Sequence, residues 1–206
     1  MEILYTGDPP SGYGRYALRC LTPAQMKSIS STVISQGIAA VVHLPADTYT
    51  NSLPVEAGSR VLLLEDIQDP GNVGTLIRTA VAFDYSGIIL TEKCADPFSP
   101  KCIQSTAGTA LSLWIRRTAT YLDLVDELRK RAYILAATDL HGQQGPSLLK
   151  EPDRLVLALG NEAAGLSDAL LKKSDCRVRI PIARTKAESL NVAVCGAICI
   201  YLSSLK

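Results

Sequence analysis

From Arg60 onward, short apolar runs alternate with segments whose apolar residues recur at helical spacing. The runs VLLLE, GIILT, LSLWIR, YILAAT, LVLALG and CRVRIPI are rich in aliphatic residues and predict strands. The segments that predict helices are residues 72–83, 100–108, 120–132 and 189–204. Because the strands show no polar alternation and are separated by helices, we expect an α/β domain with a mostly parallel sheet covered by helices on both faces.

The first 56 residues have a different pattern. Thr22 and Pro23 predict the start of a helix before AQMKSIS, and residues 38–44 form one clear apolar run, IAAVVHL. A polar stretch bounded by proline, DTYTNSLP, follows and is typical of a linker. We therefore expect two domains, a small element with its linker over residues 1–56 and a main domain over residues 57–206.

Composition and charge exclude some classes of function. The 206 residues include 21 basic and 20 acidic side chains, which argues against a polycation that binds nucleic acid by charge alone. No apolar run reaches the about 20 residues that a membrane-spanning helix needs.

The six cysteines predict reduced thiols rather than a metal site. They form no CxxC pair, and neither His43 nor His141 lies at ligand spacing from a cysteine. A zinc site is the alternative, and no metal is expected. Because the start of the chain does not resemble a signal peptide, we expect a cytoplasmic protein.

Candidate chemistry lies in three loops, because ligands of such sheets bind beyond the carboxyl ends of the strands. The first loop, DIQDPGN, ends at Asn72, which predicts an N-cap for the helix that contains Arg78. With a helix start near Val73, Arg78 lies between one and two turns in, within reach of the loop. Taken alone, a solvated or salt-bridged helix arginine is the more common role.

The second loop is GNEAAGLSDALL, residues 160–171. Gly160 and Gly165 allow the backbone to approach a ligand closely, and Glu162 is a carboxylate in a short turn. The alternative is an ordinary strand-to-helix connection capped by Ser167.

The third loop lies in IPIARTKAESLNVAV, residues 180–194. A basic patch of Arg184 and Lys186 follows the strand, and Ser189 and Asn191 stand at the start of an apolar helix. These polar residues could also be simple helix caps.

Taken together and in this order, the three loops resemble the motifs of the SpoU/TrmH family of SPOUT methyltransferases. NVGTLIRTA, GNEAAG and IPIARTKAESLNVAV match the first, second and third motifs, and STAGTA resembles the small-residue segment between them. The resemblance covers residues from about 60 to 206 and implies transfer of methyl from S-adenosylmethionine to a ribose 2′-hydroxyl of RNA. It implies ribosomal RNA as the first choice of substrate and transfer RNA as the alternative.

The resemblance also implies a fold and a site. Its trefoil knot would span about Arg154 to Ser203, a feature that periodicity cannot reveal because the usual topological rules exclude knots. The implied cofactor-binding residues are Thr138, Gly160, Ile180 and Leu190, and the implied catalytic residues are Arg78, Asn72, Glu162, Ser189 and Asn191. Because a guanidinium stays charged, we expect Arg78 to hold the adjacent phosphate and stabilise the developing alkoxide rather than act as a base.

The resemblance implies a homodimer in which the arginine of one subunit completes the other's site. The apolar C-terminal helix with Val194, Ile198 and Tyr201 is the candidate interface, and a role in the core is the alternative. Residues 21–45 resemble the second half of the L30e-like RNA-binding domain of many members, so we expect a shortened N-terminal element.

Two departures and two rival functions complete the interpretation. Arg184 stands where many members have glycine, and the stretch before SLNV is one residue longer than in those members.

One rival function is a non-catalytic RNA-binding module with the same fold, although Arg78, Glu162, Ser189 and Asn191 argue against it. The other is a nucleotide-dependent oxidoreductase, which requires G-x-G-x-x-G after the first strand, and DPGNVG does not supply it.

Overall fold

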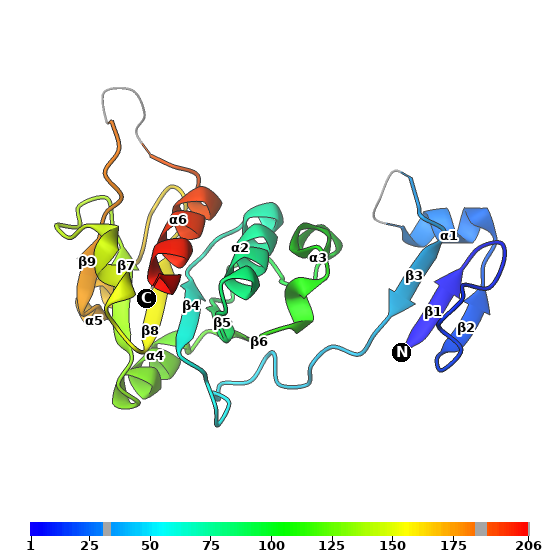
Figure 1. Cartoon of the computed structure of the whole chain (residues 1–206), viewed down its shortest axis with the longest axis horizontal. Helices are drawn as coiled ribbons and strands as arrows, with labels where there is room; N and C mark the ends of the chain where they lie inside the picture. The colour runs from blue at the N-terminus through cyan, green and yellow to red at the C-terminus, as the bar shows by residue number, and fades with distance from the viewer. Residues whose placement is uncertain (31–33, 184–188, 206) are drawn as a thin grey trace. The chain divides into compact units, whose positions relative to one another are not determined.

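The computed structural model describes residues 1–30, 34–183 and 189–205. The chain divides into two compact units, Met1–Ala46 and Asp47–Lys206 (Figure 1). The division comes earlier in the chain than the predicted boundary at residue 56, because residues 47–56 pack with the second unit. No helix among the described residues is both long and apolar enough to cross a lipid bilayer.

The first unit is a small sheet with one helix. Strand β1 (Glu2–Tyr5) pairs in parallel with β2 (Ala17–Cys20) and antiparallel with β3 (Ile38–Val41). Helix α1 (Pro23–Ile29) starts with a capping box, in which the Thr22 hydroxyl accepts from the Gln25 N–H and the Gln25 side chain accepts from the Thr22 N–H. The predicted helix start is therefore confirmed, whereas β1 and β2 were not predicted.

Within the described residues, the second unit has a six-stranded sheet in the order β6-β5-β4-β8-β7-β9. Every strand pair is parallel, so all the carboxyl ends lie at one edge and the predicted parallel α/β sheet is confirmed. The strands are β4 (Arg60–Leu64), β5 (Gly87–Leu90), β6 (Trp114–Arg117), β7 (Ile134–Thr138), β8 (Leu155–Leu159) and β9 (Cys176–Val178).

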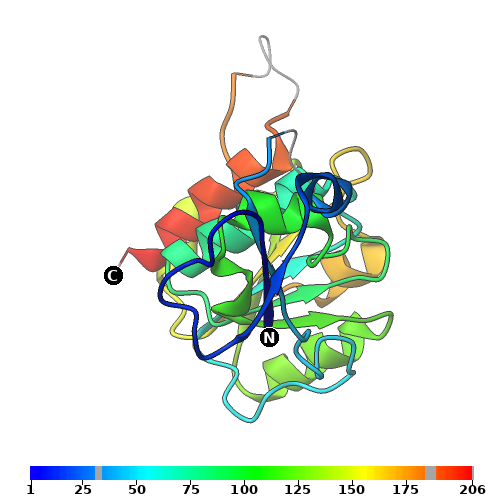
Figure 2. The ribbon, with the colours of Figure 1, turned by 90° about the vertical axis from the view of Figure 1, so that its right-hand side faces the viewer.

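Helices cover both faces of this sheet (Figures 1 and 2). Two separate buried clusters explain why the strands have no polar positions: Leu62 and Leu64 of β4 pack toward one face, and Val61 and Leu63 toward the other. The first face carries α2 (Pro70–Ala82), α3 (Pro100–Thr106) and α6 (Val192–Ser204), and the second carries α4 (Tyr121–Lys130) and α5 (Asp168–Lys173). Two 3₁₀ helices, η1 (Thr109–Leu111) and η2 (Pro146–Lys150), lie in the connections.

Helix α2 begins at Pro70, before the predicted start near Val73, and its N-cap is Asp69. The prediction that Asn72 is the N-cap was wrong: the Asp69 carboxylate accepts a 2.9 Å hydrogen bond from the Asn72 N–H, and proline suits the first helical position. This bond and one from Lys101 lower the pKa of Asp69. Arg78 consequently lies roughly two turns into the helix, and the Asn72 amide is available for other partners.

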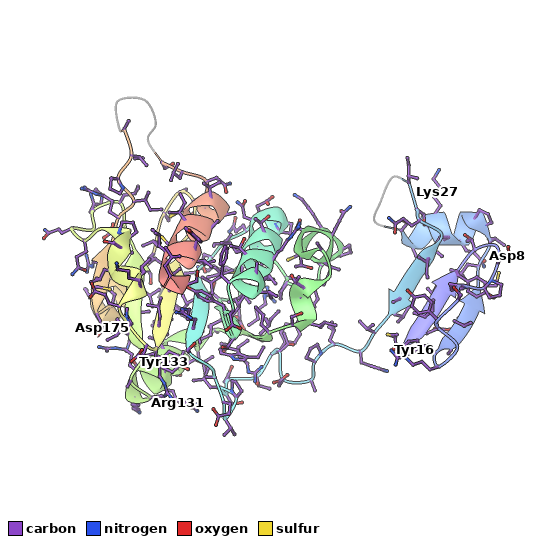
Figure 3. The ribbon with its side chains drawn as sticks, in the orientation of Figure 1. Asp8, Tyr16, Lys27, Arg131, Tyr133 and Asp175 are labelled. Atoms are coloured by element: carbon purple, nitrogen blue, oxygen red, sulfur yellow. The ribbon has the colours of Figure 1, made fainter. Side chains whose placement is uncertain are left out.

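Residues 47–58, which we call the edge strap, run along the edge strand β6 and the amino ends of the central strands. Arg116 is buried beneath the strap, where its guanidinium donates to the Ser52 carbonyl and pairs with Asp47, both at 2.6 Å. At the amino end of β7 (Figure 3), Arg131 donates to the carbonyls of Pro54 and Val55, and Tyr133 donates to that of Gly58. A covered edge strand is protected from pairing with other chains.

Arg116→Met is expected to lower the free energy of unfolding by about 1–3 kcal/mol, because the edge strap loses the charged hydrogen bond at Ser52 and the ion pair at Asp47 that the buried guanidinium makes. Urea unfolding of the full chain measures this effect. The control is Arg129→Met, because the Arg129 side chain is more exposed than that of Arg116 and its ion pair with Asp175 is expected to contribute less than about 1 kcal/mol. Equal effects of the two substitutions would contradict a structural role for the edge strap.

Candidate functional site

The loops after β4 and β8 meet at the switch point of the sheet. These strands are neighbours, and the chain leaves β4 toward α2 on one face and β8 toward α5 on the other. Such a divergence opens a crevice at the carboxyl edge, which is where ligands bind in open α/β sheets.

A hydrogen-bonded chain of three side chains joins the three loops singled out in the sequence. The Asn72 amide nitrogen donates to Glu162 Oε1 at 2.7 Å, and the Asn191 amide nitrogen donates to Asn72 Oδ1 at 3.2 Å. Asn72 therefore uses both ends of its amide, and its orientation is fixed. We call this arrangement the Asn191–Asn72–Glu162 chain.

Asn191 also acts as the N-cap of α6. Its side-chain oxygen accepts from the N–H groups of Ala193 and Val194, at 2.9 and 3.3 Å. Asn191 therefore has the capping role considered from the sequence, and its side-chain NH₂ group still links α6 to Asn72.

A cavity of about 420 Å³ lies beyond the carboxyl ends of β7, β8 and β9. This volume is in the range of small-molecule sites. The four residues expected to bind cofactor line it together with two of the expected catalytic residues: Thr138, Gly160, Ile180, Leu190, Glu162 and Ser189. The lining does not include Asn72, Arg78 or Asn191.

Sequence reasoning missed several residues that line the cavity. Asp139 directly follows β7, His141 lies two residues later, and Arg179 directly follows β9. These residues follow strands whose ends already carried expected site residues, and that position in the sequence could have identified them. Asp139 is largely buried, and its carboxylate accepts a 2.8 Å hydrogen bond from the His141 N–H.

The loop after β8 is closed by its own backbone. Asn161 and Gly165 exchange two backbone hydrogen bonds, at 3.1 and 2.9 Å, and Gly165 has a φ of +71°. A Cβ at Gly160 would lie 2.3 Å from the carbonyl carbon of Gly165. Gly160 is therefore required by loop closure, in addition to the ligand approach that the sequence suggested.

Arg78 is exposed on α2 and has no hydrogen bond or ion pair with any described residue. Ser189 is exposed where the described part of the chain resumes. The basic patch of Arg184 and Lys186, which includes the departure from the family's glycine, lies outside the described residues.

The lining of the cavity combines apolar side chains with carboxylates, and Arg179 adds a cation. Ile180, Ile182 and Leu190 supply apolar wall, and Asp139 and Glu162 supply carboxylates. Backbone N–H and C=O groups at the strand ends can match the edge of a heterocycle. Among the described residues, no group of three or more His, Cys, Asp or Glu side chains could hold a metal ion.

Comparison with known proteins places this geometry in a family. The model of the SpoU rRNA Methylase family matches residues 59–201. The 23S rRNA (guanosine(2553)-2'-O)-methyltransferase RlmP of Bacillus subtilis is 34% identical over 183 residues, which are 88% of this chain and 70% of that protein. The 23S rRNA (uridine(2479)-2'-O)-methyltransferase of Streptomyces viridochromogenes is 31% identical over 213 aligned positions, which cover 97% of this chain and 74% of that protein.

Solved structures agree with the sequence relatives. The SpoU methyltransferase AviRb from Streptomyces viridochromogenes, in complex with the cofactor AdoMet, matches with a TM-score of 0.85 and 28% identity over 98% of this chain and 81% of that one. The AdoMet-bound rRNA methyltransferase from Sinorhizobium meliloti matches with a TM-score of 0.79 and 27% identity, over 98% of this chain and 78% of that one. The chain belongs to the SpoU rRNA methylase family.

Proposed function

We propose that this protein transfers a methyl group from S-adenosylmethionine to a ribose 2′-hydroxyl of ribosomal RNA. The observation that carries the proposal is the Asn191–Asn72–Glu162 chain, which unites the three family motifs beside the cavity. Ribosomal RNA is the proposed substrate because two relatives over 30% identical are named as 23S rRNA 2'-O-methyltransferases. The same relatives do not favour transfer RNA, the alternative that the sequence left open.

The cofactor would be held by Thr138, Gly160, Ile180 and Leu190, which line the cavity. Apolar walls suit the adenine ring, and the Glu162 carboxylate complements positive charge. S-adenosylmethionine, when bound, supplies an electrophilic methyl carbon.

The side chains around the cavity would position and activate the ribose. A ribose hydroxyl is a poor nucleophile until its proton leaves, so placement and charge stabilisation supply much of the rate. Arg78 is a permanent cation that can hold the neighbouring phosphate and stabilise negative charge on the attacking oxygen. Asn72, Glu162 and Asn191 orient the site through their hydrogen bonds, and Ser189 contributes an exposed hydroxyl at the cavity.

The proposal includes a homodimer built on α6, in which Arg78 of one subunit serves the cavity of the other. Helix α6 is apolar nearly all round, and Val194 and Tyr201 are each 49% exposed. Exposed apolar side chains on such a helix favour a protein interface. The location of Arg78 outside the lining of its own cavity favours a role across subunits.

Val194→Asp is expected to convert the dimer to a monomer at micromolar concentration and to abolish methyl transfer, because the substitution places a charge in an apolar interface. Sedimentation velocity and a transfer assay measure the two effects. Val55→Asp is the matched control, since Val55 is 90% exposed on the edge strap. A fully active monomeric wild-type protein would refute the dimer.

The proposal also assigns the remaining parts of the chain. Residues 1–46 would form a partial L30e-like RNA-binding element, residues 47–56 its linker, which packs with the second unit, and residues 57–206 a SpoU-type domain with a trefoil knot over about Arg154 to Ser203. In the first unit, the Arg15 guanidinium lies 4.8 Å from the centroid of the Tyr16 ring, and such pairs offer surfaces on which RNA bases stack.

All six cysteines are free thiols, in keeping with a cytoplasmic enzyme.

Calorimetric titration with S-adenosylmethionine, repeated with NAD, tests the proposed cofactor. We expect micromolar binding of S-adenosylmethionine alone. Binding of NAD instead would favour an oxidoreductase. Binding of neither, with RNA binding retained, would favour the non-catalytic module.

A further inference from the structure

Glu65 is a buried carboxylate at the carboxyl end of β4 that the proposed chemistry does not use. Only 4% of the residue is exposed. Its Oε2 accepts from the Ser167 N–H at 2.7 Å, and its Oε1 accepts from the Ser167 hydroxyl at 2.7 Å and from the Tyr121 hydroxyl. A buried carboxylate needs such donors, and here two of the three belong to Ser167.

Ser167 marks the far end of the loop after β8, residues 160–167, which we call the cavity loop. Its hydroxyl also accepts from the Leu170 N–H as the N-cap of α5. Gly160, Glu162 and Leu166 of this loop line the cavity. The two bonds from Ser167 to Glu65 therefore tie the end of the cavity loop to the central strand of the sheet.

Asp66, the residue after Glu65, holds the near end of the cavity loop. Its carbonyl accepts a 2.9 Å hydrogen bond from the Asn161 amide nitrogen, while the Asn161 amide oxygen accepts from the N–H groups of Ala163 and Ala164. Asp66 has a φ of +57°, and its N–H donates to the Thr91 hydroxyl, which donates back to the Asp66 carboxylate. Two consecutive residues of β4's end therefore brace both ends of the loop.

The geometry points to Glu65 as a positioning residue that preorganises the cavity loop for its ligand. Its carboxylate fixes Ser167, and the loop that carries Glu162 is shaped before the ligand enters. A preformed loop avoids the ordering cost that binding would otherwise incur. This inference rests on the proposed function for the identity of the ligand, S-adenosylmethionine.

Glu65→Gln tests the brace with little change of shape. The new amide offers one acceptor oxygen where the carboxylate offered two. If that oxygen faces the two hydroxyls, the NH₂ group opposes the Ser167 N–H; if it keeps the Ser167 N–H, the Ser167 and Tyr121 hydroxyls lose the oxygen to which they donate. In either orientation the negative charge and at least one bond from Ser167 are lost. Tyr121→Phe is the matched control, because it removes one bond to the same buried carboxylate and leaves both bonds to Ser167.

For Glu65→Gln we expect the Kd for S-adenosylmethionine, measured by calorimetry, to rise by roughly tenfold or more. We expect a Kd within about twofold of wild type for Tyr121→Phe, even where its Tm falls. Hydrogen exchange of amides 161–167 should accelerate in Glu65→Gln and not in Tyr121→Phe. If Glu65→Gln does not fold, Ser167→Ala severs the hydroxyl bond from the other side and should raise the Kd and the exchange rate in the same direction.

Two results separate failure of the inference from failure of the proposed function. If both variants lower the Tm but leave the Kd and the exchange of amides 161–167 unchanged, Glu65 is only structural and the inference is overturned. If wild type does not bind S-adenosylmethionine, the proposed function fails, and the exchange experiment still decides whether Glu65 braces the loop.

Discussion

Arg78→Ala is expected to slow methyl transfer by about 100- to 1,000-fold, the effect of removing one donor that stabilises a developing oxyanion. Binding of S-adenosylmethionine should stay within about twofold, because Arg78 does not line the cavity and has no partner among the described residues. Single-turnover transfer of labelled methyl to ribosomal RNA measures the first quantity, and calorimetric titration measures the second.

Two further variants sharpen this test. Arg129→Ala is the control, since Arg129 is a helix arginine on α4, on the other face of the sheet. Arg78→Lys keeps the charge and loses the paired donors, so we expect it to recover only part of the rate if the guanidinium binds phosphate through two hydrogen bonds. Equal loss of transfer and cofactor binding in Arg78→Ala would contradict the assigned role.

Gly160→Ala is expected to weaken binding of S-adenosylmethionine by about 100-fold or more, because the cavity loop can no longer close. The new Cβ would lie 2.3 Å from the Gly165 carbonyl carbon and 2.4 Å from the Leu166 nitrogen, and both are backbone atoms. Calorimetric titration measures the Kd.

Gly145→Ala is the matched control for this substitution. Its Cβ would meet only the Ser147 hydroxyl oxygen, at 3.9 Å, and its φ of −76° suits alanine. We expect a Kd equal to that of wild type. An unchanged Kd in Gly160→Ala would show that the cavity loop does not shape the cofactor site.

Local patterns predicted the strands that are buried on both faces. β5, β7 and β8 lie within the predicted apolar runs, and β4 begins one residue before its run, because helices cover both sides of the sheet. β6 begins at Trp114, later than LSLWIR suggested, since Leu111 ends the 3₁₀ helix η1 and residues 112–113 form a bend. β2 was missed because its four residues, ALRC, are interrupted by Arg19 and form no clear apolar run.

The site could be predicted only in part. The three motifs identified Asn72, Glu162 and Asn191, but their meeting depends on β4 lying beside β8, which no local pattern determines. The hydrogen bonds that join them span 90 and 119 positions of the chain. The N-cap of α2 was misassigned because Asp69 and Asn72 both suit a cap. The role of Glu65 was missed because its donors, Tyr121 and Ser167, are distant in sequence.

The most direct test of the central claim is to incubate the full chain with S-adenosylmethionine carrying a labelled methyl group and with 23S ribosomal RNA, and then to hydrolyse the RNA in alkali. A 2′-O-methyl group removes the hydroxyl that alkali needs to cleave the next phosphodiester bond. The account predicts label in alkali-resistant dinucleotides, and loss of that label in Arg78→Ala. Label found only in mononucleotides, or no transfer by a protein that binds S-adenosylmethionine, would contradict ribose methylation of ribosomal RNA.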